Sequence, residues 1–394
     1  MKLSSRMSRI TPSATLAVKQ AAAELRARGE SVVDFGPGEP DFRSPSHVVA
    51  AAKNALDRGE THYGASAGIL SLRRGLAEAL SRRSDRPVSF QNLLVTCGGK
   101  SAILYAMLAL LEEGDEAVIP TPCWVSFPEQ VRLAGARPVL VPCDPGRGFQ
   151  PRIEDLEAAM TPRTRLLVIN SPGNPTGAVM GRSEWERIVD LVQAHDVMLL
   201  SDETYLDFVY EGDQAPSSLC WASSLGEHLV LVGSFSKAYA MTGWRVGYAA
   251  CFAERLALAM ITLQSHDTTH PTTFAQHAAL AALVEPDAGL ERMKAEYAAR
   301  RKLMLGGMEE LPGFRCAPPG GAFYIFPDVT EVVKRTGCRD DVELAARLLR
   351  EARVAVVPGT AFFAPGHLRL SYAVSRGDIR EGLGRLKQWL GTQG

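Results

Sequence analysis

The chain has 394 residues, with 43 lysines and arginines against 44 aspartates and glutamates, and a formal net charge of −1. This balance argues against nucleic acid or an anionic membrane as the main partner, because proteins that bind either one usually carry an excess of basic residues. Hydrophobic residues make up 46% of the chain and charged residues 22%, as in folded globular proteins, which excludes wholesale disorder.

The start of the chain, residues 1–15, lacks the apolar core of a secretory signal. No later apolar run approaches the ~20 residues that a membrane span needs. We therefore expect a cytoplasmic protein without a membrane partner. A cluster of glycine, proline and acidic residues at 35–41 predicts an exposed loop that leads into the main domain.

Strand and helix patterns alternate from about residue 68 to residue 250. Between apolar runs of strand length lie helical patterns, such as the stripe of Ile69, Leu72, Leu76 and Leu80 with a period close to 3.6 residues. This alternation predicts βαβ units and a mainly parallel sheet. The expected strands are Leu93–Thr96, Ala117–Ile119, Val139–Val141, Leu166–Ile169, Met198–Leu200, Leu229–Val232 and Val246–Ala250.

The pattern changes after residue 285, where a long charged helix over 291–310 precedes short strands and a further helix. The change predicts a large α/β domain built on the parallel sheet and a smaller α+β domain that includes the N-terminal arm. The expected bounds are 1–45 for the arm, 46–285 for the large domain and 286–394 for the small domain. The expected strands of the small domain are Ala322–Phe326, Val354–Val357 and Leu368–Tyr372.

Polar side chains follow four of the expected strands. Ligands of a doubly wound sheet bind outside the carboxyl ends of its strands, so these groups are candidate binding residues. Together they suit one anionic, aromatic ligand with an electrophilic carbon. The runs are CGGKS (97–101), NSPGNPTG (170–177), SDETY (201–205) and GSFSK (233–237), the last followed by TGWR (242–245).

The run Gly99-Lys100-Ser101 resembles the end of a nucleotide-binding P-loop. That motif requires a glycine five positions before Gly99, where this chain has Leu94, so the pattern does not indicate a nucleotide hydrolase. Two glycines that open a helix still offer backbone amides and a positive dipole end to a single phosphate. A tight strand-to-helix turn without a ligand explains the run equally well.

The strongest cluster is Ser234, Ser236 and Lys237, with Arg245 eight residues beyond the lysine. Two hydroxyls and a guanidinium suit a phosphate dianion. A lysine beside them can form a Schiff base with an aldehyde where burial and nearby cations lower its pKa. Taken alone, Lys237 would be a surface lysine on a turn, but it closely follows an apolar strand.

With these runs in place, the chain resembles the class I/II aminotransferases of fold type I, which use pyridoxal 5′-phosphate (PLP), and is most similar to their aspartate/prephenate branch. The resemblance extends from about Ser13 to the C-terminus. Each run is weak evidence by itself, but their shared order and spacing are specific. Besides NSPGNPTG, SDETY and SFSKAYAMTGWRVGY, the matching runs are GEPDF (38–42), HYGASAGI (62–69), VTCGGKSA (95–102), TPCWVSFPEQV (121–131), GGAFY (320–324), VVPGTAF (356–362) and HLRLSYA (367–373).

The resemblance implies catalytic roles for Lys237, Asp202 and Tyr205. Lys237 matches the lysine that carries PLP as a Schiff base and moves a proton during the reaction. Asp202 matches the carboxylate that keeps the pyridine nitrogen protonated, although an aspartate after a strand also serves as a helix N-cap. Tyr205 and Asn174 match donors to the phenolic oxygen of the cofactor, while Asn174 by itself would suit an Asn-Pro turn.

The resemblance also implies a binding site for the phosphate of the cofactor. Ser234, Ser236 and Arg245 match the residues of this site, and the backbone amides of Gly99 and Lys100 complete it.

Two aromatic residues have implied roles at the same site. Trp124 matches the residue that covers the ring of the cofactor, where stacking contributes on the order of 1 kcal/mol, although a tryptophan is more often part of the core. Tyr63 matches a tyrosine that reaches the phosphate of the neighbouring subunit. This match implies a homodimer with shared active sites.

For the substrate, Arg369 matches the arginine that binds the α-carboxylate in a bidentate fork. Gly38 matches a backbone contact beside it, and Trp124 and Asn174 border the same space.

Lys100 decides the expected substrate class. In this branch a lysine in the Gly-Gly-Lys turn is associated with substrates that carry a second carboxylate, such as aspartate, glutamate, prephenate or arogenate. Its ammonium on a flexible stem can follow a distal carboxylate. The competing interpretation is that Lys100 neutralises the phosphate or is solvated. Ser13 and Thr15 would add hydroxyl donors from the arm.

The run 264–273 departs from the family pattern. Close members usually have a serine before the proline, where this chain has His270-Pro271, with Asp267 nearby. The segment is expected near the dimer interface. We interpret His270 as an interface hydrogen-bonding residue rather than a catalyst, because Lys237 already serves as the proton shuttle.

No metal site is expected. The seven cysteines are scattered without a C-x-x-C pair, and the eight histidines form no cluster with them. This pattern argues against both a structural zinc site and a disulfide framework.

The function expected from these matches is a ping-pong transfer of an amino group from an L-amino acid to a 2-oxo acid, with an aspartate-like donor favoured. The alternatives are an aromatic, prephenate or alanine-type aminotransferase, a PLP lyase of the same fold, and a PLP-binding regulator without turnover. The intact set of Lys237, Asp202, Arg245 and Arg369 argues against the regulator, because a pure binder needs no proton shuttle.

Overall fold

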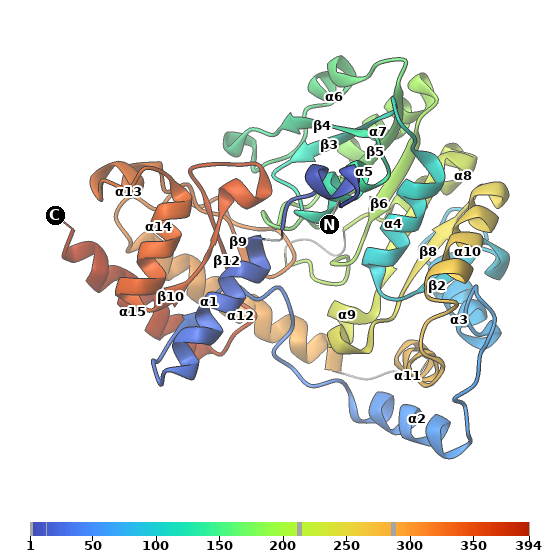
Figure 1. Ribbon diagram of the computed structural model, residues 1–394, viewed down its shortest axis with the longest axis horizontal. Coiled ribbons are helices and arrows are strands. Elements are labelled where there is room, and N and C mark those ends of the chain that lie inside the picture. The colour runs from blue at the N-terminus through green and yellow to red at the C-terminus, as the bar shows by residue number, and fades with distance from the viewer. Residues whose placement is uncertain (1–2, 13, 211–214, 285–288, 394) are drawn as a thin grey trace.

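The computed structural model describes residues 3–12, 14–210, 215–284 and 289–393. A large group of elements surrounds a seven-stranded sheet, and a smaller group of helices and short strands, mostly C-terminal, lies beside it (Figure 1). The first long helix, α1 (Ala14–Ala27), packs against the smaller group. Among the described residues, no helix is both long enough and apolar enough to cross a membrane.

The large sheet is mainly parallel, which confirms the predicted fold class. Its strand order is β2-β8-β7-β6-β5-β3-β4, and only β8 runs antiparallel to its neighbours. The connection from β7 to β8 contains no crossover helix of the length that a parallel pair needs, which explains this reversal. The strands are β2 (Leu93–Thr96), β3 (Glu116–Thr121), β4 (Arg137–Pro142), β5 (Thr164–Asn170), β6 (Met198–Asp202), β7 (Leu229–Ser234) and β8 (Gly247–Cys251).

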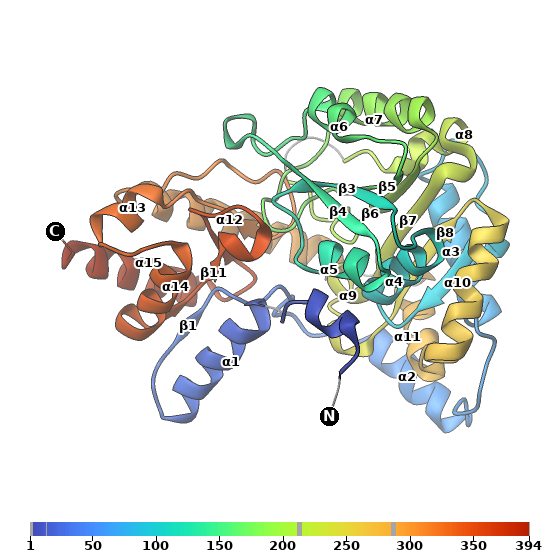
Figure 2. The same ribbon diagram turned by 45° about the horizontal axis from the view of Figure 1, so that its top comes forward.

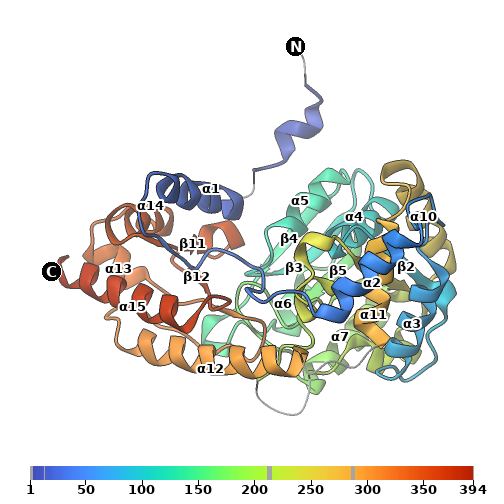
Figure 3. The same ribbon diagram turned by 90° about the horizontal axis from the view of Figure 1, so that it is seen from below.

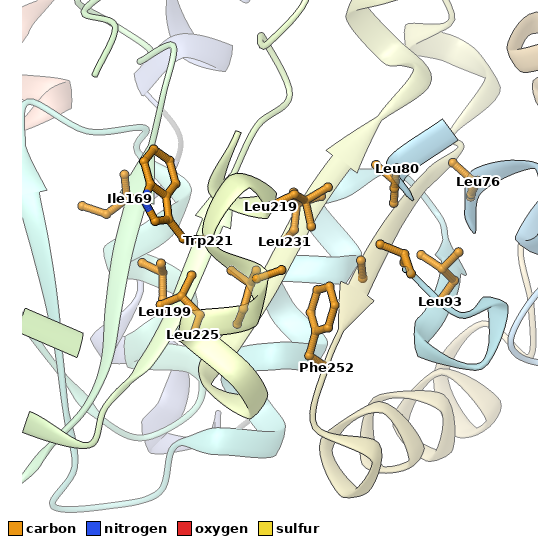
Figure 4. Packing of buried hydrophobic residues seen from close by; sticks show 14 of the residues in the cluster. Leu76, Leu80, Leu93, Ile169, Leu199, Leu219, Trp221, Leu225, Leu231 and Phe252 are labelled. Carbon is orange, nitrogen blue, oxygen red and sulfur yellow. The ribbon is translucent and has the colours of Figure 1, made fainter. Parts of the chain in front are cut away.

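Helices cover both faces of this sheet (Figure 2). Side chains of successive strand residues alternate between two cores, with Leu199 in one and Leu200 in the other. Figure 4 shows part of the first core, in which Leu199 and Leu231 lie together with Trp221 and Phe252. The first core is covered by α2 (Ser46–Asp57), α3 (Leu70–Ser81), α6 (Ile153–Ala159), α7 (Arg182–His195), α8 (Ala222–Leu225) and α11 (Thr273–Val284), and the second by α4 (Gly99–Leu110), α5 (Ser126–Leu133) and α10 (Glu254–Asp267).

The smaller group has its own core and two short sheets (Figure 3). β1 (Val33–Asp34) pairs in parallel with β10 (Val354–Ala355), which ties the N-terminal arm to this group. β12 (Leu368–Ser371) lies between β11 (Val357–Pro358) and β9 (Tyr324–Ile325) and is antiparallel to both. The helices of this group are α12 (Gly289–Glu309), α13 (Thr330–Arg335), α14 (Asp341–Arg347) and α15 (Arg376–Gly391).

Two short helical segments shape the site described below, α9 (Phe235–Ala238) and the 3₁₀ turn η6 (Thr242–Trp244). The remaining short turns are η1 (Ser5–Arg9), η2 (Phe90–Asn92), η3 (Pro145–Arg147), η4 (Ser218–Trp221), η5 (Gly226–His228), the π-turn η7 (Leu348–Ala352) and η8 (Gly359–Phe362).

The structure corrects the expected strands of the smaller group. The apolar run 354–357 divides into β10 and β11, because its first half pairs with β1 and its second half with β12. The strand expected at 322–326 shortens to β9. The domain boundary expected between residues 285 and 286 lies outside the described residues.

Candidate active site

A cavity of about 350 Å³ opens at the carboxyl ends of β2, β5, β6 and β7. It is bordered by residues of the large sheet, of the smaller group and of the arm helix α1. The structure brings every expected site residue except Tyr63 to this cavity: Gly38, Gly99, Lys100, Trp124, Asn174, Asp202, Tyr205, Ser234, Ser236, Lys237, Arg245 and Arg369.

Three polar groups lie at the carboxyl ends of neighbouring parallel strands, and the strand register aligns two of them. Asn170 is the last residue of β5, Asp202 of β6 and Ser234 of β7. Asn170 pairs with Asp202 across the sheet, and its Nδ2 donates to the backbone carbonyl of Asp202 at 3.0 Å. An amide, a carboxylate and a hydroxyl therefore reach one edge of the sheet, as expected for parallel strands.

Lys237 lies on α9, directly after β7, with its side chain at the cavity. Its Nζ donates a hydrogen bond to the backbone carbonyl of Gly38. The same atom lies 5.8 Å from the centre of the Tyr205 ring. The amine is thus held at the point where the large sheet meets the segment that leads out of the arm.

Burial lowers the pKa of Lys237 to about 8. The positive charges of Arg369 and Arg245 act in the same direction, while the carboxylates of Glu39 and Asp202 oppose it. A lysine with this pKa is partly neutral near pH 7. It can act as a nucleophile and as a carrier of protons.

Asp202 is buried, with 5% of its surface exposed. Its Oδ1 accepts a hydrogen bond from the backbone amide of Thr204 at 3.1 Å. The residues that follow form a turn and not a helix, so Asp202 is not a helix N-cap. Burial raises the pKa of Asp202, and the Thr204 hydrogen bonds and the charge of Lys237 oppose this shift. A buried carboxylate of this kind favours a cationic N–H as its partner.

Ser234, Ser236 and Arg245 form one corner of the cavity. Ser234 Oγ donates to Ser236 Oγ at 2.8 Å and accepts from the Ser236 amide at 3.1 Å. The guanidinium of Arg245 donates to the backbone carbonyls of Thr242 at 2.8 Å and Cys97 at 3.3 Å. Two hydroxyls and a fixed guanidinium are therefore arranged around one space.

The first turn of α4 completes this corner. Gly98 precedes the helix with a φ of 82°, which favours glycine. A Cβ at Gly98 would lie 3.0 Å from Cζ of Arg245, so the glycine allows the guanidinium to approach the start of the helix. The positive end of the α4 dipole and Arg245 together favour an anion at this point. This packing weakens the interpretation of the Gly-Gly run as a bare turn.

Arg369 lies in β12 with only 3% of its surface exposed. It donates from Nη1 to Asn174 Oδ1 at 3.0 Å and from Nη2 to the Gly36 carbonyl at 2.5 Å, and its Cζ lies 4.6 Å from the Tyr324 ring centre. Its Nε has no hydrogen-bond partner among the described residues. A buried guanidinium with an unused donor is suited to a carboxylate ligand.

Tyr324 also borders the cavity, although its sequence position alone predicted no role for it. Its hydroxyl lies 2.6 Å from that of Tyr205. Burial is the largest cause that raises the pKa of Tyr205, so this phenol stays neutral and can donate a hydrogen bond. The GGAFY run contained Tyr324, but only the pairing of β9 with β12 places it beside Arg369.

Lys100 and Trp124 lie together on another wall. Lys100 Nζ is 4.7 Å from the centre of the Trp124 ring, within the range of cation–π attraction. Burial, followed by the charge of Arg245, lowers the pKa of Lys100. Trp124 borders the cavity, so it is available to a ligand as well as to the core.

Tyr63 lies away from the cavity with 88% of its surface exposed. Its ring stands edge-on to His270, with ring centres 5.9 Å apart. His270 Nε2 accepts from the Gly64 amide at 3.0 Å, and Nδ1 donates to the Pro271 carbonyl at 2.6 Å. His270 thus makes hydrogen bonds within its own chain, and the reach of Tyr63 into a neighbouring subunit stays a prediction.

Three further residues were named from the sequence, and the structure describes two of them, Asp267 and Thr15. Asp267 accepts a hydrogen bond from the Tyr105 hydroxyl at 2.6 Å. Thr15 borders the cavity from α1. Ser13 lies outside the described residues.

Two further charged residues border the cavity without having been assigned from the sequence, Glu39 and Lys19. Glu39 belongs to the GEPDF run, and an acidic residue inside a matched motif was a signal for it. Lys19 had no such signal. Only the packing of α1 against β10 and β11 brings it to the cavity.

A family model described as aminotransferase class I and II matches residues 30–386. Among the similar proteins is an aspartate/prephenate aminotransferase of Thermus thermophilus, 44% identical over 393 residues with 99% of each chain covered. An aspartate aminotransferase of Bacillus subtilis is 40% identical over 390 residues, again with 99% of each chain covered.

Solved structures show the same likeness. The structure of aspartate aminotransferase from Thermus thermophilus with maleate matches with a TM-score of 0.92 and 43% identity, covering 98% of this chain and 99% of that one. The aspartate aminotransferase from Rhizobium meliloti matches with a TM-score of 0.94 and 36% identity, with 99% of each chain covered.

Proposed function

The chain belongs to the class I and II aminotransferases, and from this membership and the cavity we propose that it transfers the amino group of a dicarboxylic L-amino acid, aspartate first, to a 2-oxo acid. The cofactor of this family is PLP. The single observation that carries the substrate class is the placement of two cationic side chains, Arg369 and Lys100, on walls of one cavity.

The residues present fit PLP. Ser234, Ser236 and Arg245 offer the donors that a phosphate dianion needs, beside the positive end of α4. Asp202 offers a buried carboxylate to a protonated ring nitrogen, and Lys237 offers an amine of lowered pKa. The corner that would hold the phosphate also depends on Gly98, which leaves room for the guanidinium.

When bound, PLP supplies an aldehyde for the amino group and a ring that accepts electrons from the substrate carbon. In our proposal the Nζ of Lys237 accepts the proton that leaves the α-carbon of the amino acid. It would then donate this proton to the carbon of the former aldehyde group of the cofactor. Asp202 keeps a positive charge on the ring nitrogen through its own negative charge. Tyr205 and Asn174, both neutral, would donate hydrogen bonds to the phenolic oxygen of the cofactor.

The two carboxylates of the substrate would bind at separate points. Arg369 receives the α-carboxylate, because its unused Nε and the neighbouring Nη donate in the fork geometry that a carboxylate accepts. Lys100 receives the distal carboxylate with a mobile ammonium. The Thermus relative whose structure contains maleate, a four-carbon dicarboxylate, supports this class.

The test of this assignment is Lys100→Ala. We expect kcat/KM for aspartate and glutamate to fall roughly 30- to 100-fold, as for loss of a charged hydrogen bond. Alanine and phenylalanine should lose less than about threefold, since they carry no distal charge. Steady-state kinetics with four donors and 2-oxoglutarate measure the difference.

Ile103→Val is the matched control, because it changes the cavity wall without removing a charge or a hydrogen-bond donor. Equal losses for all four donors in Lys100→Ala would show that Lys100 serves the cofactor, and the dicarboxylate assignment would then be abandoned.

We also propose a homodimer in which Tyr63 of each subunit contacts the phosphate in the other. The exposure of Tyr63 and its distance from its own cavity support this arrangement. The division into an arm (1–45), a large domain (46–285) and a small domain (286–394) is part of the same proposal, and the separate cores of the two groups support it.

Mixing two defective proteins tests the shared site. Tyr63→Phe removes one donor to the phosphate and should weaken PLP binding about tenfold, while Lys237→Ala removes the proton carrier. A hybrid dimer has one site with both residues intact if Tyr63 acts across the interface. Activity at limiting PLP should therefore rise when the two variants are unfolded together and refolded, compared with either alone. No gain in the refolded mixture would place Tyr63 outside the partner site.

A further inference from the structure

The segment 36–39 crosses from the smaller group to the cavity and is contacted by three cationic side chains. These cations come from α1, α9 and β12, which are distant in the sequence. The contacts are Arg369 to the Gly36 carbonyl, Lys237 to the Gly38 carbonyl and Lys19 to the Glu39 carboxylate.

The carboxylate of Glu39 joins the arm to the large group. Oε1 lies 3.4 Å from Lys19 Nζ, and Oε2 accepts from Thr242 Oγ1 at 3.1 Å. The carbonyl of Thr242 in turn accepts from Arg245 at 2.8 Å. One carboxylate therefore contacts both the helix that borders the cavity mouth and the turn that orients Arg245.

Four charged groups surround Lys237, and all four border the same cavity as its side chain. Glu39 directly follows Gly38, whose carbonyl accepts the hydrogen bond of Lys237. Arg369 on β12 and Arg245 after η6 disfavour its protonated form, and Glu39 and Asp202 favour it. Of the two carboxylates, Asp202 is committed to the ring nitrogen in the proposed function. Glu39 is then the acid that remains to act on the amine. The phenol of Tyr205 faces Lys237 as well but stays neutral.

We propose that Glu39 is a positioning residue that sets the proton affinity of Lys237, and that Lys19 of α1 moderates this effect by pairing with Glu39. The inference rests on the proposed function only for the commitment of Asp202. The carboxylate of Glu39 contacts Lys19 and Thr242. It acts through the field of its charge and through Thr242.

Replacing Lys19 tests the proposal, because a merely structural role of Glu39 would predict no opposite shift of the Lys237 pKa. Its side chain and that of Glu39 are both substantially exposed, at 61% and 45%, so the pair contributes little to stability. A cation beside a carboxylate weakens the field that the carboxylate exerts on a third group. Removing Glu39 and removing Lys19 should therefore shift the pKa of Lys237 in opposite directions.

The experiment measures the pKa of Lys237 in the protein freed of PLP. Trace labelling with acetic anhydride is followed across pH 6 to 11, and the peptide containing Lys237 is quantified by mass spectrometry. In Glu39→Gln the pKa should fall, and labelling at pH 7 should be ~3- to 10-fold faster than in the parent chain. In Lys19→Gln the pKa should rise and labelling at pH 7 should slow by ~2- to 3-fold.

Glu129→Gln is the matched control. Glu129 accepts two hydrogen bonds from Thr11, so this change removes a carboxylate that contacts the arm without touching Glu39. We expect its Lys237 labelling to match that of the parent chain. In the PLP-loaded enzyme, the acidic limb of the kcat/KM profile should move in the same direction as the labelling pKa of each variant.

An unchanged pKa of Lys237 in Glu39→Gln would overturn the proposal, and so would shifts of the same sign in Glu39→Gln and Lys19→Gln. If Glu39→Gln does not fold, an unchanged pKa in Lys19→Gln overturns it alone. The labelling needs no substrate, so its result is separate from any failure of the enzyme to accept dicarboxylic donors.

Discussion

Replacing Lys237 by alanine should lower the rate of amino-group transfer by at least ~10⁴-fold, because the change removes both the nucleophile and the proton carrier. The protein should still fold and bind PLP without a covalent link. Lys237 makes one hydrogen bond, to Gly38, and its charged form is disfavoured by burial. Ser234, Ser236 and Arg245 remain to bind the phosphate. Single-turnover kinetics with aspartate and circular dichroism measure the two outcomes.

Borohydride reduction of the parent protein identifies the lysine independently. It should attach PLP to one peptide, the one that contains Lys237. Lys100 provides the matched control, since it borders the same cavity as a second lysine of lowered pKa. The Lys100→Ala protein should label at Lys237 as before. A label on Lys100 or Lys19 would contradict the assignment.

Asp202→Asn should slow the first half-reaction by roughly 10²- to 10³-fold while PLP stays bound. Asparagine has the same shape, and its Oδ1 can still accept from the Thr204 amide, so the local turn is kept. What is lost is the negative charge that holds a proton on the ring nitrogen. Stopped-flow spectroscopy of the bound cofactor, after mixing with aspartate, measures this rate.

Glu203→Gln separates a charge effect on the chemistry from a general effect of buried carboxylates. Glu203 is the next residue and is also buried, but its oxygens accept hydrogen bonds from Ser201, Ser217 and Ser218, and it does not border the cavity. Its amide variant should lower the melting temperature and leave the half-reaction rate nearly unchanged. A normal rate in Asp202→Asn would show that the ring nitrogen has another partner.

The pH dependence of the cavity lysine follows from its surroundings. Below about pH 8 Lys237 is increasingly protonated in the protein without PLP, so its reactivity as a nucleophile falls as the pH falls. Desolvation, followed by the charge of Arg245, also lowers the pKa of Lys100.

The alternation of apolar runs with helical patterns determined the large sheet. Each of the seven expected strands is present. Most of them are buried on both faces and therefore apolar over most of their length, and such runs are visible without a partner. The edge strand β4 is less buried, but its apolar run at 139–141 was also visible. The same reasoning determined the candidate site. Asn170, Asp202 and Ser234 end parallel strands, and the carboxyl ends of parallel strands meet at one edge.

Contacts between distant segments were decided only by the tertiary structure. Tyr324 meets Tyr205 because residues 208–210 pair with residues 320–322. Arg369 meets Gly36 across 333 residues of the chain. The division of the run 354–357 between two sheets depends on the partner strands β1 and β12 and not on its own residues.

Glu39 shows most clearly the difference between what local sequence patterns predict and what the tertiary structure decides. It lies in a run that matches the family, but no role was expected for it. Its contacts with Lys19 and Thr242 exist only because α1 packs on the smaller group while η6 follows the large sheet. Local patterns report which residues are apolar or follow a strand, since those properties depend on near neighbours. Which charges face one another depends on how separate groups of elements pack, and no local period records that.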